Sequence, residues 1–152
     1  MQPRMNFYKA SPDAMKAVMG LETFVQKSGL EASLIDLVKT RASQINGCAY
    51  CVHMHTKEAR QHGESEERLY LLSAWHESPL YTARERAALA WTEAVTLVAE
   101  SRVPDDVYEE ARQHFSETEL VNLTVAVAAI NAWNRLAISF RAVHPTAAAQ
   151  TA

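Results

Sequence analysis

The sequence predicts an all-α fold of about six to seven helices in a single domain. Its 152 residues include only 4 glycines and 5 prolines, and alternating apolar and polar runs of the strand type are scarce. Polar residues that favour helix starts precede several segments with apolar residues at helical spacing. We assign residues 1–145 to this domain and expect residues 146–152 to form a flexible C-terminal tail.

The first half of the chain predicts four helices separated by short breaks. Ser11 supplies an N-cap and Pro12 occupies the first turn that follows it. Asn46–Gly47 breaks the helical pattern ahead of the third helix, and Gly63 closes that helix. The four helices are expected at about residues 12–29, 31–45, 48–62 and 66–74.

The second half of the chain predicts three helices with the same kinds of start signal. Thr82 and Ser116 each precede a glutamate by three residues, which is the capping-box pattern. Pro104 is followed by two aspartates, and acidic residues are favourable in a first helical turn. We expect one helix from the Thr82 cap through Val98, one starting at Pro104, and a longest one from about Glu117 to Ala142.

Composition argues against several classes of protein. A formal net charge of −3 and a pI near 6.1 give no basic footprint for nucleic acid. No apolar run approaches the ~20 residues that span a bilayer, and the N-terminus lacks the apolar stretch of a secretory signal. We therefore expect a cytoplasmic protein with no nucleic-acid or membrane partner, whose only two cysteines lie in a reducing compartment.

These two cysteines, Cys48 and Cys51, are separated by two residues, and His55 follows one turn later. On a helix the three residues share one face. Two thiols at this spacing can close a disulfide, and a thiolate with a partner that captures its oxidised form can reduce a peroxide or a disulfide. Redox chemistry is therefore the leading interpretation, with a structural disulfide or a metal site as alternatives.

An acidic residue in the preceding helix is a candidate for the same site. Asp36 is the only acid in the apolar stretch of residues 34–38. A carboxylate flanked by aliphatic residues is either an exposed helix position or a functional group. Together with the two thiols and His55, it would supply a proton relay.

Asn131, Asn134 and Arg135 are polar residues on an otherwise apolar helix. We interpret them as hydrogen-bonding groups between helices or subunits rather than as pocket lining.

The segment Arg41-Ala-Ser-Gln-Ile-Asn-Gly-Cys48-Ala-Tyr-Cys51-Val-His-Met-His55 resembles the signature of the AhpD-like alkylhydroperoxidases, in the carboxymuconolactone decarboxylase superfamily. The resemblance continues through most of residues 15–140. It implies an all-helical domain with the CxxC at the start of a central helix. It further implies a homo-oligomer, often a hexamer or a trimer, with thiol-dependent peroxidase or disulfide-reductase activity.

The resemblance also implies roles for individual residues. Cys51 corresponds to the thiol that attacks the peroxide, Cys48 to its resolving partner, and His55 to the family histidine. Asp36 falls at the relay position, where the family has glutamate, and Tyr50 stands where adaptor members carry a second histidine. Electrostatics at a helix N-terminus, taken alone, favour Cys48 as the more reactive thiol; we follow the family and take Cys51.

The expected activity is thus reduction of a small hydroperoxide, with catalytic residues Cys51, Cys48, His55 and Asp36. A dithiol of the thioredoxin or lipoyl type would restore the thiols, and no cofactor or metal is required. Two other functions remain open. One is a lactone decarboxylase of the carboxymuconolactone type, and the other is a non-enzymatic thiol–disulfide redox switch.

Overall fold

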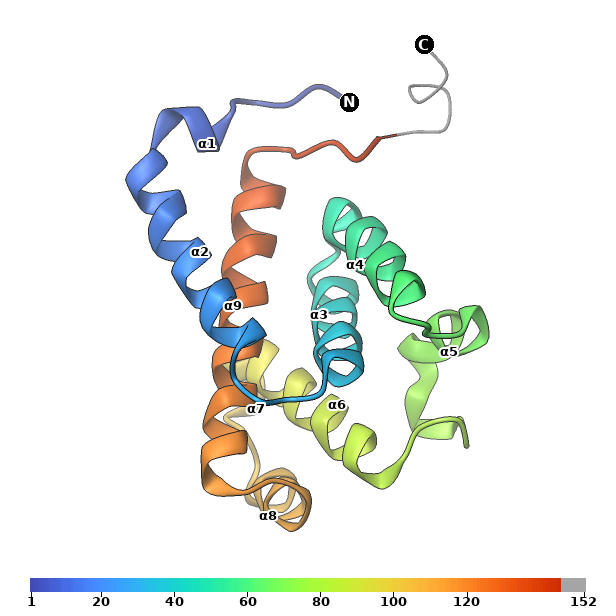
Figure 1. The fold of residues 1–152 in the computed structure, drawn as a ribbon. Helices are drawn as coiled ribbons and strands as arrows, with labels where there is room; N and C mark the ends of the chain where they lie inside the picture. The colour runs from blue at the N-terminus through green and yellow to red at the C-terminus, as the bar shows by residue number, and fades with distance from the viewer. Residues whose placement is uncertain (146–152) are drawn as a thin grey trace.

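Residues 1–145 are described by the computed structural model, in which helices follow one another along the chain and none of these residues forms a strand (Figure 1). The all-α prediction is confirmed. The elements in chain order are α1 (Phe7–Ala10), α2 (Pro12–Gln26), α3 (Ala32–Asn46), α4 (Ala49–Gln61), α5 (Glu66–Leu71), the 3₁₀ helix η1 (Leu72–Glu77), α6 (Ala83–Thr96), α7 (Val98–Ser101), α8 (Asp105–His114) and α9 (Glu117–Ser139).

The seven predicted helices are present, with differences at their ends. α9 ends at Ser139 rather than near Ala142, because Phe140 already has a non-helical backbone conformation. The predicted segment from Glu66 to Ala74 is a short α-helix that continues as the 3₁₀ helix η1. The four-residue helices α1 and α7 were not predicted, since one turn has no apolar period to detect. The expected tail, residues 146–152, lies outside the described residues.

Helix α3 occupies the centre of the arrangement and packs against α4, α6 and α9 (Figure 1). α2 packs along α9 on the other side, and α8 packs against α6. The main apolar core lies where α3, α6, α8 and α9 meet, and it includes Leu34, Val38, Trp91, Phe115 and Val127. Burial of these side chains holds α3 rigidly, so the turn that leaves α3 toward α4 has a fixed position.

Both capping boxes predicted from sequence are formed. The Thr82 hydroxyl accepts a hydrogen bond from the backbone N–H of Glu85, whose carboxylate accepts one from the N–H of Thr82 in return. Ser116 and Glu119 make the same reciprocal pair at the start of α9. These pairs satisfy N–H groups that have no partner inside the helix, which fixes where α6 and α9 begin.

By length and composition alone, α9 is long and apolar enough to cross a membrane. The expectation that no apolar run approaches the length of a membrane span is therefore corrected for this helix. Half of its most apolar window is buried inside the described domain, where α9 packs against α2, α3 and α6. Its apolar character therefore has a structural explanation as the core helix of this fold.

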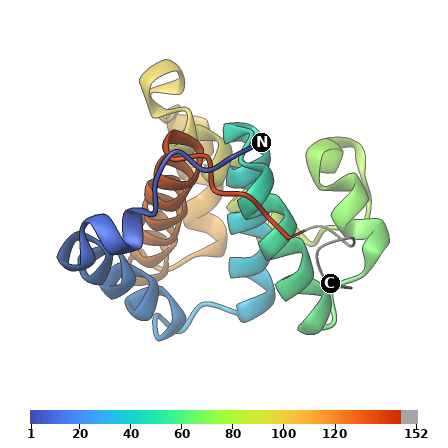
Figure 2. The same ribbon diagram turned by 90° about the horizontal axis from the view of Figure 1, so that it is seen from above.

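The two ends of the described chain meet above α9. Figure 2 shows the first residues and the segment after α9 running across the same end of the helices. The Arg4 backbone N–H donates to the carbonyl of Phe140 at 3.0 Å, and the Arg4 guanidinium donates to the carbonyl of Ser139 at 2.8 Å. These bonds fasten the N-terminal segment to the last turn of α9.

Candidate active site

The turn between α3 and α4 sets the position of the cysteine pair. Gly47 ends α3 in the left-handed conformation, with φ of 69°, which glycine adopts without steric cost. The N–H groups of Gly47 and Cys48 donate to carbonyls of the last turn of α3, at 3.1 and 3.0 Å. Cys48 is then the N-cap of α4, and Cys51 lies in its first turn.

A buried amide network holds this turn against α9. The side-chain amide of Asn46 donates to the side-chain oxygens of Asn131 and Asn134, at 3.0 and 2.8 Å. Asn134 in turn donates to the Ser43 hydroxyl at 3.1 Å. The exposed Arg135 donates to Asn131 within α9. Asn131 and Asn134 therefore bond between helices, as predicted, and the last turn of α3 is tied to α9 just ahead of Cys48.

Cys48 and Cys51 form a disulfide in this structure, with their Cα atoms 5.3 Å apart. Both residues are 2% exposed. The Cys48 sulfur also accepts a hydrogen bond from the backbone N–H of Cys51 at 3.3 Å. The fold thus brings the two sulfurs within bonding distance, which is the arrangement that a reversible dithiol pair needs.

Cys51 lies on the wall of a cavity of about 790 Å³, whereas Cys48 is not among the described residues that line it. The cavity lies between α2, α3, α4 and the end of α9, and the two terminal segments line it at one side. Aromatic and aliphatic side chains form much of the wall. They include Phe7, Tyr8, Tyr50, Met54 and Trp133. An apolar organic molecule that enters here meets Cys51 first.

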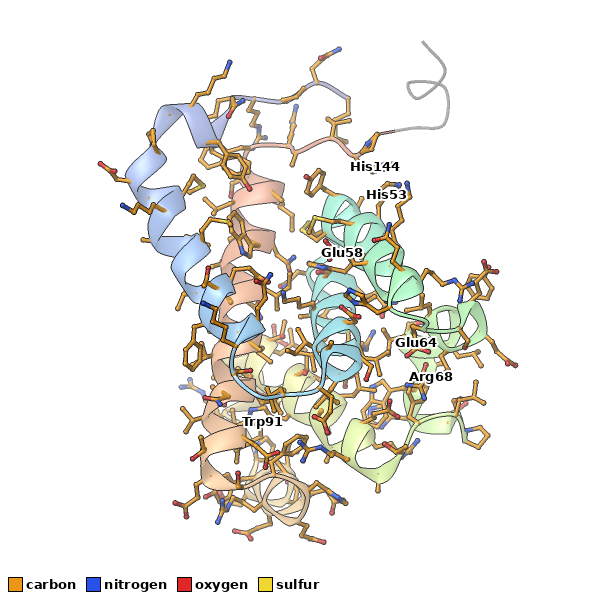
Figure 3. The ribbon with its side chains drawn as sticks, in the orientation of Figure 1. His53, Glu58, Glu64, Arg68, Trp91 and His144 are labelled. Carbon is orange, nitrogen blue, oxygen red and sulfur yellow. A yellow bond between two sulfur atoms is a disulfide. The ribbon has the colours of Figure 1, made fainter. Side chains whose placement is uncertain are left out.

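His55 also lines this cavity, and Glu58 lies beside it on α4 (Figure 3 labels Glu58). The ring nitrogen Nδ1 of His55 lies 2.8 Å from Oε2 of Glu58. The hydrogen bond from His55 lowers the pKa of Glu58, whose carboxylate can then only accept, so Nδ1–H is the donor. Nε2 of His55 is buried and has no hydrogen-bond partner among the described residues. His55 therefore presents an unengaged nitrogen in the wall that contains Cys51.

Asp36 is buried at the wall of the same cavity, as the sequence interpretation required. Its hydrogen-bond partner is one that the sequence analysis did not assign: Nδ1 of His62 lies 2.7 Å from Oδ2 of Asp36. This hydrogen bond raises the pKa of His62. The cavity thus brings Cys51, His55 and Asp36 together. Each of its two acid–histidine pairs is separate: Glu58 pairs with His55, and Asp36 pairs with His62.

A third charged pair completes the polar part of the cavity. Lys39 is buried on α3 and forms an ion pair with Glu22 of α2. Both residues line the cavity. Neither was predicted, although Lys39 follows Asp36 by three residues and so lies on the same side of α3.

Two further cavity residues, Glu58 and His62, were not predicted from the sequence. Glu58 lies three residues after His55, and i, i+3 residues are neighbours on a helix, so spacing could have indicated it. In residues 1–145, no three His, Cys, Asp or Glu side chains converge as a metal site would require. His53 points elsewhere and stacks on His144, with ring centroids 4.6 Å apart (Figure 3).

The three tryptophans lie in the core or at the cavity wall. Trp75 and Trp91 are buried in apolar clusters. Trp133 is half-buried at the cavity wall, where its ring lies 6.2 Å from that of Tyr8. Trp133 is thus part of the candidate site as well as of the helix packing.

The model of the carboxymuconolactone decarboxylase family matches residues 12–94, more than half of the chain. The chain belongs to this family. The matched region includes Asp36, both cysteines, His55, Glu58 and His62, so the family domain contains every cavity residue discussed here except those of the termini and α9.

Relatives that match over nearly their whole length place this family member among AhpD-like proteins. The uncharacterized protein YdfG of Bacillus subtilis is 41% identical over 139 residues, which are 91% of this chain and 95% of YdfG. A crystal structure from Agrobacterium tumefaciens has 56% identity and a TM-score of 0.93, and the match covers 95% of this chain and 99% of that one. That protein is of unknown function and has been proposed to be the antioxidant defence protein AhpD.

A more distant member of the same fold is the debrominase Bmp8. Its structure has a TM-score of 0.82 and 20% identity, covering 94% of this chain and 76% of the debrominase. At this identity the likeness establishes the fold only. The fold therefore accommodates more than one chemistry, and the activity of this family member has to be argued from its own site.

Proposed function

We propose that this protein is a thiol-dependent peroxidase that reduces small organic hydroperoxides with the Cys48–Cys51 pair. The observation that carries the proposal is that Cys51, bonded to Cys48, lines an apolar cavity together with the unengaged Nε2 of buried His55. A substrate oxygen, a nucleophilic sulfur and a general base then share one site.

The oxidative half-reaction begins with the reduced pair. The Cys51 thiolate attacks the terminal peroxide oxygen, the O–O bond breaks, and an alkoxide leaves while Cys51 becomes a sulfenic acid. Cys48 sulfur then attacks the Cys51 sulfur and displaces hydroxide, which forms the disulfide. Protons taken up by the alkoxide and the hydroxide give an alcohol and water. His55 is the group placed to pass protons to and from Cys51.

The reductive half-reaction requires a second substrate. A dithiol reduces the Cys48–Cys51 disulfide and is itself oxidised to a disulfide, so that one hydroperoxide is consumed for each dithiol. We propose a reductant of the thioredoxin or lipoyl type, a reducing cytosol as the location, and a homo-oligomer as the working form. The family membership supports these proposals, and the peroxidase chemistry itself does not depend on them.

Steady-state consumption of cumene hydroperoxide with dithiothreitol tests this function. The wild-type protein should turn over many times, and Cys51→Ser should abolish consumption. Without dithiothreitol, Cys48→Ser should consume one equivalent and leave Cys51 as a sulfenic acid that dimedone labels, as mass spectrometry can show. Retained turnover by Cys51→Ser would contradict the proposal. Oxidation of the wild type by one equivalent, without turnover in excess dithiothreitol, would instead indicate a redox switch.

A further inference from the structure

We propose that His62 exchanges protons between bulk water and the cysteine site, acting through Asp36. His62 lies at the cavity wall and is hydrogen-bonded to Asp36, so the role we assign to it is proton exchange through that carboxylate. The inference rests on the proposed peroxidase function. It adds His62, which has no role in the chemistry of Cys48, Cys51 and His55 described above.

The geometry of the Asp36–His62 pair joins the inside of the protein to its surface. The side chain of Asp36, on α3, is 9% exposed, whereas that of His62, at the end of α4, is 54% exposed. The two are joined by a 2.7 Å hydrogen bond. A proton that His62 takes from water thus has a direct hydrogen-bonded route to a carboxylate in the cavity wall that contains Cys51.

The carboxylates around His62 favour its protonated form. Asp36 and Glu58 face it from α3 and α4, and its hydrogen bond to Asp36 is the main cause that raises its pKa. Lys39, which is paired with Glu22 of α2, lines the same cavity. The Glu58 carboxylate interacts with both His55 and His62.

The chemistry creates a need for such a route. A dithiol attacks the disulfide as thiolate, so its two protons are lost to water outside the site. Two electrons pass to the Cys48–Cys51 pair, and the next hydroperoxide takes them up when its O–O bond breaks to give alkoxide and hydroxide. Two protons per turnover must therefore enter a site whose cysteines are both 2% exposed. The His55–Glu58 pair gives one connection to water, since the Glu58 side chain is 45% exposed, and the Asp36–His62 pair gives a second, whose outer group is a histidine.

Variants at position 62 test this role with cumene hydroperoxide and dithiothreitol in dilute buffer. His62→Gln should lower turnover by about tenfold, less than the loss typical for a direct general acid or base. Added imidazole should restore much of that loss and leave the wild type unchanged. His76→Gln is the matched control, because His76 is also exposed and also lies beside a carboxylate, that of Glu93 at 3.4 Å, away from the cavity.

His62→Lys separates proton exchange from a structural ion pair. Lysine keeps a cation next to Asp36 but holds its proton throughout the neutral range, so this variant should resemble His62→Gln. Wild-type turnover in His62→Lys, or in His62→Gln at every buffer concentration, would overturn this inference. The peroxidase function would still stand in that case, provided that Cys51→Ser is inactive. Turnover by Cys51→Ser would overturn the peroxidase itself and this inference with it.

Discussion

Nδ1 of His55 lies 2.8 Å from Oε2 of Glu58, and this contact determines which nitrogen of His55 can act as a base. Because the carboxylate accepts from Nδ1–H, the lone pair of the neutral ring is at Nε2, the buried nitrogen without a partner among the described residues. Glu58 thereby fixes the tautomer and the orientation of the His55 ring.

Glu58→Gln should weaken His55 as a base. The amide removes the negative charge beside the ring, so we expect hydroperoxide turnover near neutral pH to fall by about tenfold or more. Steady-state rates at pH 7 measure this effect. Glu66→Gln, at a residue of α5 whose carboxylate accepts from Tyr70, is the control. Wild-type turnover in Glu58→Gln would refute this assignment.

Trp133→Ala should change substrate preference rather than reactivity. Trp133 contributes an aromatic wall to the cavity but is not part of the acid–base cluster. We expect KM for cumene hydroperoxide to rise by about tenfold, since an aromatic contact of this kind contributes roughly 1–2 kcal/mol. The kcat/KM for hydrogen peroxide, which has no apolar part, should stay within about twofold. An equal loss with both peroxides would mean that Trp133 supports the fold and not the substrate.

Asn134→Ala should destabilise the protein strongly. Asn134 is fully buried, donates to Ser43 and accepts from Asn46, so its removal deprives the buried Ser43 hydroxyl of its donor and leaves Asn46 with Asn131 alone. We expect the free energy of unfolding in urea to fall by about 2–4 kcal/mol. Val121→Ala, 62% exposed on the same helix, should change it by less than about 0.5 kcal/mol. A small effect of Asn134→Ala would show that water replaces the lost amide.

The helices and the cysteine turn could be predicted because their signals are local. Ser116 and Glu119 cap α9 within one turn, and Gly47 ends α3 through its own backbone freedom. These features depend on residues three or four positions apart, and sequence displays them directly. Cys48 as the first residue of a helix followed from the same kind of signal.

The pairing of the charged groups could not be predicted, because it depends on how α3 and α4 cross. Asp36 and His62 are 26 residues apart, and their contact follows from the packing of two helices. The same holds for Tyr8 and Trp133, which meet only because the N-terminal segment is fastened to the end of α9. Sequence spacing identified the cysteine pair, and tertiary packing determined the partner of Asp36 and the shape of the cavity.

Glu119 should make the stability of the protein depend on pH in the acid range. Its carboxylate accepts from the N–H and the hydroxyl of Ser116 and from the guanidinium of Arg84. The backbone hydrogen bond from Ser116 is the main cause that lowers the pKa of Glu119 to about 2 from 4.5. A carboxyl with a lower pKa in the folded state stabilises that state above its unfolded pKa, and this contribution is lost as pH falls through the folded pKa.

Urea unfolding at a series of pH values measures this contribution. The wild type should be more stable than Glu119→Gln at about pH 6, and the difference should shrink as the pH falls from about 5 to 2. Glu67→Gln, at an exposed position on α5, should parallel the wild type throughout. Because the Glu119 side chain is partly open to solvent, added salt should reduce the Arg84 part of the difference and leave the Ser116 part. A difference between wild type and Glu119→Gln that is constant across this range would mean that the carboxylate charge contributes nothing and the side chain acts only as a neutral cap.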